Sequence, residues 1–259
     1  NTSCVAVSKG GERPTLVLDA GTGLQKLTKA LAGKPFQGSI LLGHLHWDHT
    51  HGIPFFGAGD RPDARANLLM PAQGDAGELM DRVMSPPHFP ITTEELRGEW
   101  WVGSLEPGKH EIEGFEVLAL EIPHKGGRTF GFRISDGRST IAYLSDHSPI
   151  NFGPGPDSVG EYHDAARTLA EGVDLLIHDA QYTNVEFPDR ATFGHSTVEY
   201  AIGLAEASMA KGLLLFHHDP SRTDDQLDEI LSQHQASCPW LDAAIEGTSI
   251  ELPARALSR

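Results

Sequence analysis

The stretch Leu42-Gly43-His44-Leu45-His46-Trp47-Asp48-His49 places three histidines and an aspartate in one short segment of the chain. It follows Ser39-Ile40-Leu41-Leu42, an apolar run that is typical of a buried strand. Four side chains of the kinds that bind metal ions therefore leave the end of one predicted strand. A histidine-rich surface loop is the alternative interpretation.

The spacing within this loop predicts how its side chains divide between ions. Neighbouring side chains of an extended segment diverge, whereas residues two apart can converge. We expect His44 and His46 to bind one metal ion. Asp48 and His49, just past the bend, suit a second ion nearby.

The composition bounds the class of protein. With 259 residues, 39% of them hydrophobic, the chain can bury a substantial core. Its formal charge of −16 repels polyanions at long range, so we expect no long nucleic acid as a partner, although a small phosphate-containing ligand is admissible. No apolar run reaches the roughly 20 residues of a membrane span, so no membrane partner is expected.

Two features of the chain bear on its cellular context. The two cysteines are too few for a disulfide framework, and cytoplasmic localisation is the default expectation. The chain begins at Asn1 without Met, so we expect the natural start to be missing.

Alternating strand and helix patterns predict an α/β fold. Thr15-Leu16-Val17-Leu18 is followed by the turn Gly21-Thr22-Gly23 and by leucines at helical spacing, and similar units recur along the chain. A last strand is predicted at Ser249 to Leu252. We expect one domain over residues 1–259, built from two sheets packed face to face with helices outside.

Further candidate ligands follow four other apolar runs. They are His124, Asp146, the pair His178-Asp179 and the pair His217-His218. Any one of them alone is more often a packing, capping or turn residue than a ligand. Together with the loop they form a coherent set, because a metal site is closed by side chains from distant segments.

The expected ligand set serves two divalent ions. His44, His46 and His124 would hold one ion, Asp48, His49 and His217 the other, and Asp146 would bridge them. Imidazole and carboxylate ligands favour Zn²⁺, while Mn²⁺ or Fe remain compatible.

These residues resemble the metallo-β-lactamase superfamily, whose signature is an HxHxDH loop followed by a later His, Asp and His. The resemblance covers nearly the whole chain, and His44 to His49 spell the signature in full. It implies a four-layer αββα sandwich, the metallo-β-lactamase fold, with a two-metal hydrolytic site at one edge. The superfamily is chemically broad, so the fold alone does not fix the reaction.

Two later motifs resemble the ribonuclease Z and cyclic-nucleotide phosphodiesterase branch. His178-Asp179-Ala180 is similar to its HEAT motif, with Asp179 in place of glutamate, and His195-Ser196-Thr197 is similar to its HST motif. The resemblance implies that His195 gives a proton or a hydrogen bond to the scissile phosphate, oriented by Asp179. The alternative is that His195 caps the following helix.

One departure from ribonuclease Z affects the expected substrate. That family carries a projecting tRNA-binding arm between its third His ligand and the bridging Asp, whereas only a tight hairpin separates His124 from Asp146 here. We therefore expect a phosphodiesterase for a small substrate such as a cyclic nucleotide. Hydrolysis of a lactone, ester or β-lactam on the same site, or a non-catalytic metal-binding module, are the alternatives.

The remaining residues have supporting roles in this hypothesis. Asp48 would also orient the attacking water, and Asp19 would contact the metal loop from the preceding turn. His217 and His218 compete for the last ligand position, and we assign it to His217, with His218 fixing a ligand or Asp179 from outside the ligand set. The resemblance also makes a homodimer possible.

A few other histidines can be interpreted in two ways. They are His51, His147 and His178, each of which could support the ligands from outside or serve only packing or capping.

Overall fold

The computed structural model describes residues 1–236, 238 and 240–252, and it divides into two compact units. Unit 1 comprises Asn1–Pro107 and Glu111–Gly114, and unit 2 comprises Gly108–His110 and the chain from Phe115 onward. Within the described ranges, none of the helices has the length and apolar character needed to cross a bilayer.

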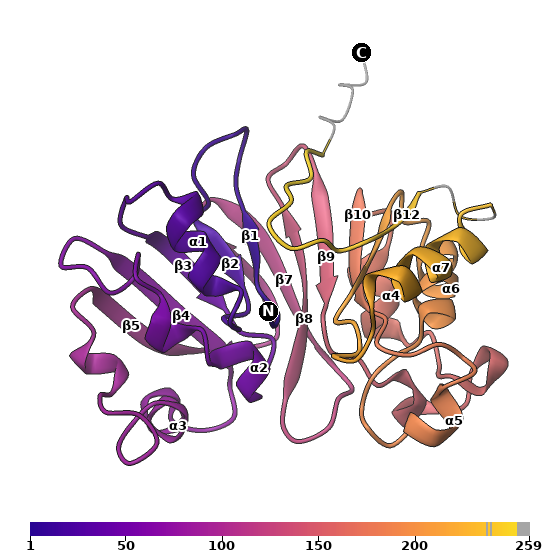
Figure 1. The fold of residues 1–259 in the computed structure, drawn as a ribbon, viewed down its shortest axis with the longest axis horizontal. Helices are drawn as coiled ribbons and strands as arrows, with labels where there is room; N and C mark the ends of the chain where they lie inside the picture. The colour runs from indigo at the N-terminus through magenta and orange to yellow at the C-terminus, as the bar shows by residue number, and fades with distance from the viewer. Residues whose placement is uncertain (237, 239, 253–259) are drawn as a thin grey trace. The chain divides into compact units, whose positions relative to one another are not determined.

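Unit 1 is built on a five-stranded sheet (Figure 1, indigo to purple). In sheet order its strands are β1 (Val5–Val7), β2 (Leu16–Leu18), β3 (Gln37–Leu41), β4 (Arg65–Pro71) and β5 (Glu99–Leu105). β1 is antiparallel to β2, whereas β2 to β5 run parallel. β2 is wholly apolar, and β3 and β4 each contain a shorter apolar run, as expected of strands in a parallel sheet.

Short helices complete unit 1. They are α1 (Leu24–Ala30), α2 (Trp47–Thr50), α3 (Ala76–Val83) and the 3₁₀ helices Ile53–Phe55 and Thr93–Glu95. Leu24 and Leu27 of α1, with Leu31 just after it, recur at helical spacing and are buried with β2, β3 and β4 in one core. Asp75 caps α3 by accepting a hydrogen bond of 2.9 Å from the Glu78 N–H.

In the part of the chain that the structure describes, the sheet of unit 2 has seven strands (Figure 1, magenta to yellow). In sheet order they are β12 (Leu241–Ala243), β11 (Leu213–Phe216), β10 (Leu175–Asp179), β9 (Thr140–Leu144), β8 (Thr129–Ser135), β7 (Phe115–Ile122) and β6 (Gly108–Ile112). β9 to β12 are parallel, and β8 is antiparallel to both β7 and β9. β7 and β9 therefore run in the same direction.

Helices pack against this sheet through an extensive apolar core. α4 (Asp164–Ala170) packs against β7, β8 and β9, α6 (Val198–Ala207) against β10 and β11, and α7 (Asp224–His234) against β12. The remaining helices are α5 (Phe187–Arg190) and the 3₁₀ helices Pro149–Phe152 and Pro156–Ser158. Leu169, Leu176 and Tyr200 are among the buried residues of this core.

Strand direction decides where polar side chains gather in each unit. In unit 1 the parallel strands β2 and β3 end at one edge, so Asp19 and the histidine loop leave the sheet side by side. In unit 2 the carboxyl ends of β7, β9, β10 and β11 share an edge, because β7 is parallel to β9. Ligands of open α/β sheets bind at such edges.

The α/β class and most of the elements agree with the sequence prediction, and the strand predicted at Ser249 to Leu252 is wrong. These four residues form no strand, and Ile250 is 51% exposed. Alternating apolar residues need a neighbouring strand to pair with, and the last strand of the sheet is instead β12. β6 and β12 were missed because both are short and interrupted by polar residues.

Candidate active site

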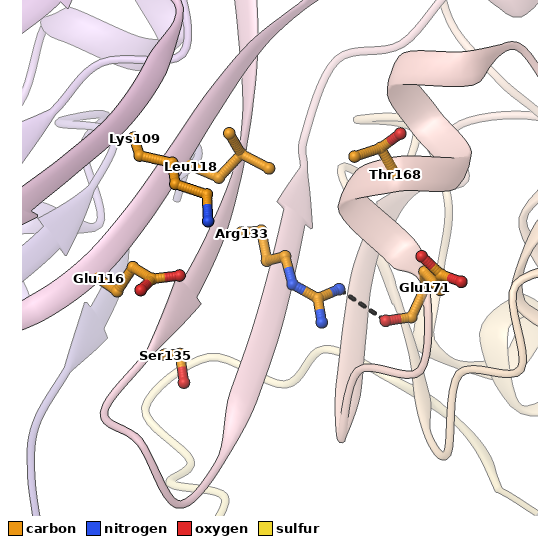
Figure 2. A pocket seen from close by; sticks show the side chains of 7 residues that line it. All are labelled: Lys109, Glu116, Leu118, Arg133, Ser135, Thr168 and Glu171. Carbon is orange, nitrogen blue, oxygen red and sulfur yellow. Dashed lines mark hydrogen bonds between the residues drawn. The ribbon is translucent and has the colours of Figure 1, made fainter.

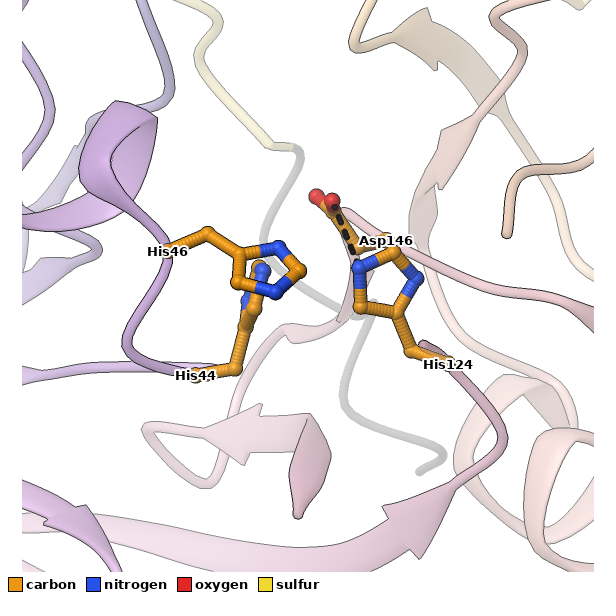
Figure 3. A group of neighbouring side chains, drawn as sticks. All are labelled: His44, His46, His124 and Asp146. Carbon is orange, nitrogen blue, oxygen red and sulfur yellow. Dashed lines mark ion pairs between the residues drawn. The ribbon is translucent and has the colours of Figure 1, made fainter. Parts of the chain in front are cut away.

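The predicted metal ligands of unit 1 lie in the loop after β3, which carries His44 and His46, and in the first turn of α2, which carries Asp48 and His49. The buried ring of His44 lies 4.4 Å from the ring of His46 and 4.2 Å from that of His49, between centroids. Figure 3 shows His44 and His46 extending from this loop. Asp48 Oδ2 lies 3.3 Å from His49 Nε2. All four residues belong to groups that could hold a metal ion.

Asp19 holds this loop from the end of β2. Its carboxylate is fully buried, accepts a hydrogen bond of 2.7 Å from the Gly43 N–H, and lies 2.8 Å from His49 Nδ1. Asp19 itself has a left-handed backbone, φ 59°, which is uncommon for a residue other than glycine. The structure thus places Asp19 against the loop and gives His49 an anionic partner for Nδ1–H.

The turn after Asp19 brings the two segments into contact. The Ala20 N–H donates to the His49 carbonyl, and the Gly52 N–H donates to the Ala20 carbonyl. A Cβ at Gly21 would collide with the carbonyl oxygen of Asp48. The glycine therefore permits a close backbone approach, and this agrees with a structural role for the turn.

Three predicted ligands of unit 2 follow three of its strands. His124 lies after β7, Asp146 after β9 and His217 after β11. The Asp146 carboxylate lies 3.5 Å from His124 Nε2, the ion pair dashed in Figure 3, and 3.6 Å from His217 Nδ1. Asp146 is 1% exposed. These three residues also belong to groups that could hold a metal ion.

A hydrogen bond to His124 and an ion-pair contact to His49 indicate which ring nitrogen of these two predicted ligands is available. His124 Nδ1 lies 2.6 Å from the Gly194 carbonyl, so it must be the protonated nitrogen, and His49 Nδ1 is protonated toward Asp19. In the neutral rings, the Nε2 lone pair of His124 faces the Asp146 carboxylate at 3.5 Å, and that of His49 faces the Asp48 carboxylate at 3.3 Å. Two facing lone pairs repel each other unless a cation lies between them, so in both units the neutral rings and carboxylates fit a divalent metal ion.

The pair Asp179 and His195 lies beside these ligands in unit 2. His195 Nδ1 donates to Asp179 Oδ2 at 3.0 Å and lies 3.9 Å from Asp146 Oδ2. The His195 side chain is 13% exposed, and its ring stacks on His217 at 5.0 Å between centroids. The structure therefore brings His195, Asp179 and two predicted ligands together.

The capping alternative for His195 does not hold. Thr197 is the residue that caps α6, because its side chain accepts a hydrogen bond of 3.0 Å from the Tyr200 N–H. The Thr197 hydroxyl also donates a hydrogen bond of 2.7 Å to Asn184 Oδ1, which anchors the segment. His195 lies before this cap with its ring directed to Asp179.

The two adjacent histidines after β11 have different surroundings. His217 has a left-handed backbone, φ 54°, and its ring lies near Asp146. Burial, and then the neighbouring His217, lower the pKa of His218 to about 4, while its hydrogen bond to the Ala244 backbone and the charge of Asp179 oppose this shift. Backbone strain of this kind clusters at functional sites, which is consistent with a ligand role for His217.

Comparison with known proteins identifies the family. Residues 15–218, more than half of the chain, match the family model described as the β-lactamase superfamily domain. The chain belongs to the β-lactamase superfamily. This membership confirms the predicted metallo-β-lactamase resemblance and the prediction of a metal-dependent hydrolase.

Individual relatives agree with the family match. The ribonuclease Z of Anoxybacillus flavithermus is 25% identical, with 97% of this chain and 92% of that protein covered. The fold resembles the metallo-β-lactamase fold protein YhfI of Bacillus subtilis, with a TM-score of 0.69 and 20% identity. The match covers 95% of this chain and 90% of YhfI. It also resembles human tRNase Z, short form, with a TM-score of 0.68 and 20% identity, over 97% of this chain and 93% of the human protein. The predicted fold is confirmed.

These relatives contradict the prediction that no long nucleic acid is a partner. Proteins named ribonuclease Z and tRNase Z match this chain over nearly its whole length. The hairpin between His124 and Asp146 is short, as predicted, but its shortness does not exclude RNA. The charge argument failed because −16 is a sum over the whole chain, whereas binding depends on the local field around the site.

One partly buried histidine near the site was missed from the sequence. His163 precedes α4 and caps it, with Nδ1 accepting from the Ala166 N–H. Its Nε2 lies 2.7 Å from Nε2 of His147. A histidine directly before a helix was the available signal, but no pattern in the sequence links it to His147.

A separate hollow lies at the opposite edge of the unit 2 sheet from the predicted ligands. Its volume is about 230 Å³, and it is lined by Lys109, Glu116, Leu118, Arg133, Ser135, Thr168 and Glu171 (Figure 2). Arg133 donates hydrogen bonds to the carbonyls of Leu169 and Glu171, at 3.0 Å and 2.6 Å. It thereby closes the carboxyl end of α4, which gives this arginine a structural role.

Proposed function

We propose that this superfamily member is a binuclear metal-dependent phosphodiesterase and that residues 1–259 act as one hydrolase domain. The observation that supports it most directly is the hydrogen bond of 3.0 Å between His195 Nδ1 and Asp179 Oδ2, beside Asp146. A histidine held in this way can act as a general acid that protonates the alkoxide leaving from a phosphodiester. The ribonuclease names of the relatives support the same reaction class.

The proposed ligands are those expected from the sequence. They are His44, His46 and His124 for one ion, Asp48, His49 and His217 for the other, and Asp146 for both. Zn²⁺ suits this mixture of imidazole and carboxylate best, and Mn²⁺ or Fe are compatible. When bound, two such ions neutralise charge on the phosphate oxygens and lower the pKa of the water that attacks.

The protein side chains would orient the water and complete the proton transfers. Asp48 is 38% exposed, so its carboxylate can accept a hydrogen bond from the attacking water and orient it. Asp179 holds His195 through Nδ1–H and stabilises its protonated form, which leaves Nε2–H for the leaving oxygen. As the P–O bond breaks, the leaving oxygen takes this proton, and the products are a phosphomonoester and an alcohol.

The substrate that we propose is a small phosphodiester such as a cyclic nucleotide. The short β8–β9 connection between His124 and Asp146 supports a compact substrate. RNA is the second candidate, favoured by the ribonuclease names of the relatives. Both substrates contain the same scissile bond, so they share the proposed mechanism.

A substrate panel tests the reaction class. Metal-replete protein would be assayed on a cyclic nucleotide, bis-p-nitrophenyl phosphate, a short RNA, a lactone and nitrocefin. We expect turnover of the diesters and none of the last two, and Asp146→Asn is the inactive control. Turnover of RNA alone would reassign the substrate within the phosphodiesterase class. Turnover of only the lactone or nitrocefin would contradict the proposal.

A further inference from the structure

Three histidines of unit 2 that lie outside the proposed ligand set form a connected chain of hydrogen bonds. His147 Nε2 lies 2.7 Å from His163 Nε2, and His147 Nδ1 lies 3.0 Å from His178 Nε2. His178 Nδ1 lies 2.7 Å from the carbonyl oxygen of Asp179. His147 and His178 are completely buried, and both contact the ring of the buried Tyr200.

The two ends of the chain fix the tautomer of every ring. A carbonyl only accepts, so His178 Nδ1 carries a proton and, in the neutral ring, Nε2 accepts from His147 Nδ1–H. At the other end, His163 Nδ1 accepts from the Ala166 N–H at 3.5 Å, so Nε2 carries its proton. That proton points to His147 Nε2. One proton per ring satisfies every bond, and all bonds run toward Asp179.

The protonation of the outer two rings agrees with this arrangement. Burial is the main cause that lowers the pKa of His163 to about 4, and burial also lowers the pKa of His178. Both rings are therefore neutral near pH 7, as one proton per ring requires.

The chain of hydrogen bonds ends on Asp179, the residue that orients His195. Asp179 Oδ2 accepts from His195 Nδ1 and from the His147 backbone N–H, each at 3.0 Å. Asp179 Oδ1 accepts from the Gln181 N–H at 3.1 Å. His147 therefore holds Asp179 twice, by its own N–H to the carboxylate and through His178 to the carbonyl.

Two other roles for the three histidines conflict with the geometry. A proton relay to His195 is excluded because the chain ends on a backbone carbonyl, which cannot pass a proton on. A shared metal ion is excluded because His147 uses different ring nitrogens for its two neighbours, so the three rings do not converge on one point.

We propose that His163, His147 and His178 are positioning residues for the reaction, which hold the Asp179 backbone and carboxylate so that His195 keeps its orientation. This inference rests on the proposed phosphodiesterase function for its kinetic consequence. Supporting residues of this kind, hydrogen-bonded behind the groups that act, are worth about 10-fold to 100-fold in activity.

Two substitutions of His163 separate positioning from helix capping. His163→Asn keeps an acceptor near the Nδ1 position for the Ala166 N–H but loses the donor to His147. His163→Gln places an amide donor near the Nε2 position but loses the cap. Phe152→Leu is the control, because Phe152 contacts the His163 ring at 4.7 Å between centroids without a hydrogen bond to it.

Steady-state kinetics and thermal unfolding should distinguish the variants. We expect His163→Asn to lower kcat about 10-fold with little change in KM and in Tm. His163→Gln and Phe152→Leu should keep wild-type kcat. His163→Gln should nevertheless lower Tm, because it loses the helix cap. Wild-type kcat for His163→Asn, or kcat losses that follow Tm across the three variants, would overturn the proposal.

Nitrogen-15 NMR of the histidine rings decides the same question without any activity. The wild type should show Nδ1–H tautomers for His147 and His178, an Nε2–H tautomer for His163 and a hydrogen-bonded Nδ1–H for His195. In His163→Asn, His147 should populate both tautomers and the His195 resonance should shift. Other wild-type tautomers, or an unchanged His195 in that variant, would refute the inference. An inactive wild type with the expected NMR result would refute only the phosphodiesterase function.

Discussion

The two units carry chemically similar side chains but assemble them in opposite ways. Unit 1 takes His44, His46, Asp48 and His49 from six consecutive residues, and Asp19 contacts this segment at Gly43 and His49. Unit 2 collects its residues from the ends of strands that lie far apart in the sequence. The cluster of unit 1 depends on one turn, whereas that of unit 2 depends on the register of a whole sheet.

This difference has a consequence for the supporting interactions. In unit 1 the buried Asp19 carboxylate binds both the Gly43 N–H and His49, so one charge orients the loop. In unit 2 two backbone N–H groups hold the Asp179 carboxylate, and a chain of neutral histidines holds its backbone carbonyl. We therefore expect unit 1 to be sensitive to a single charge and unit 2 to the direction of its hydrogen bonds.

The largest effect is expected from the carboxylate that we propose as shared by both ions. Asp146→Asn removes its charge, so metal content should fall below one equivalent and turnover should fall to background. Metal analysis by mass spectrometry with a diester assay would measure both. Asp136→Asn in the β8–β9 turn is the matched control and should leave both unchanged. Two retained equivalents in Asp146→Asn would show that it is not a bridging ligand.

A smaller effect is expected at the support of unit 1. Asp19→Asn keeps the size of the side chain but loses the charge that holds His49 Nδ1–H, so metal affinity should fall about 10-fold to 100-fold. Titration with buffered metal would measure this change, and excess metal should restore turnover. Unaltered affinity would mean that the loop is held by its backbone alone.

The smallest effect is expected from pH on stability in unit 2. His163 faces His147, His178 and Asp164, and burial lowers its folded pKa to about 4, below the ordinary histidine value of 6.5. The unfolded chain therefore binds more protons between these values, so stability is full above pH 6.5 and declines toward pH 4. Urea midpoints at several pH values should fall less steeply for His163→Asn than for the wild type. Identical slopes would show that His163 is not the group responsible.

The sequence was most informative where chemistry is local. The loop of unit 1 could be predicted from six residues, and the ends of β7, β9, β10 and β11 could be predicted from apolar runs followed by His or Asp. Their gathering at one edge of unit 2 follows from parallel strands, which alternating strand and helix patterns anticipate.

Other features depend on tertiary contacts that no sequence pattern reports. The link from His163 to Asp179 passes through three rings from separate segments, and its direction depends on tautomers. The strand predicted at Ser249 to Leu252 failed because apolar alternation does not supply a pairing partner. The exclusion of RNA failed because net charge does not describe the field at the site.

The most direct test of the proposed mechanism is a paired measurement of turnover and metal content in His195→Ala. Because we propose that His195 acts on the leaving oxygen and is not a ligand, turnover of a cyclic nucleotide should fall about 10²-fold to 10⁴-fold. The two metal equivalents should remain, as in the wild type. Loss of metal together with turnover would make His195 a ligand or a structural residue, and unchanged turnover with both ions bound would contradict its role as the acid.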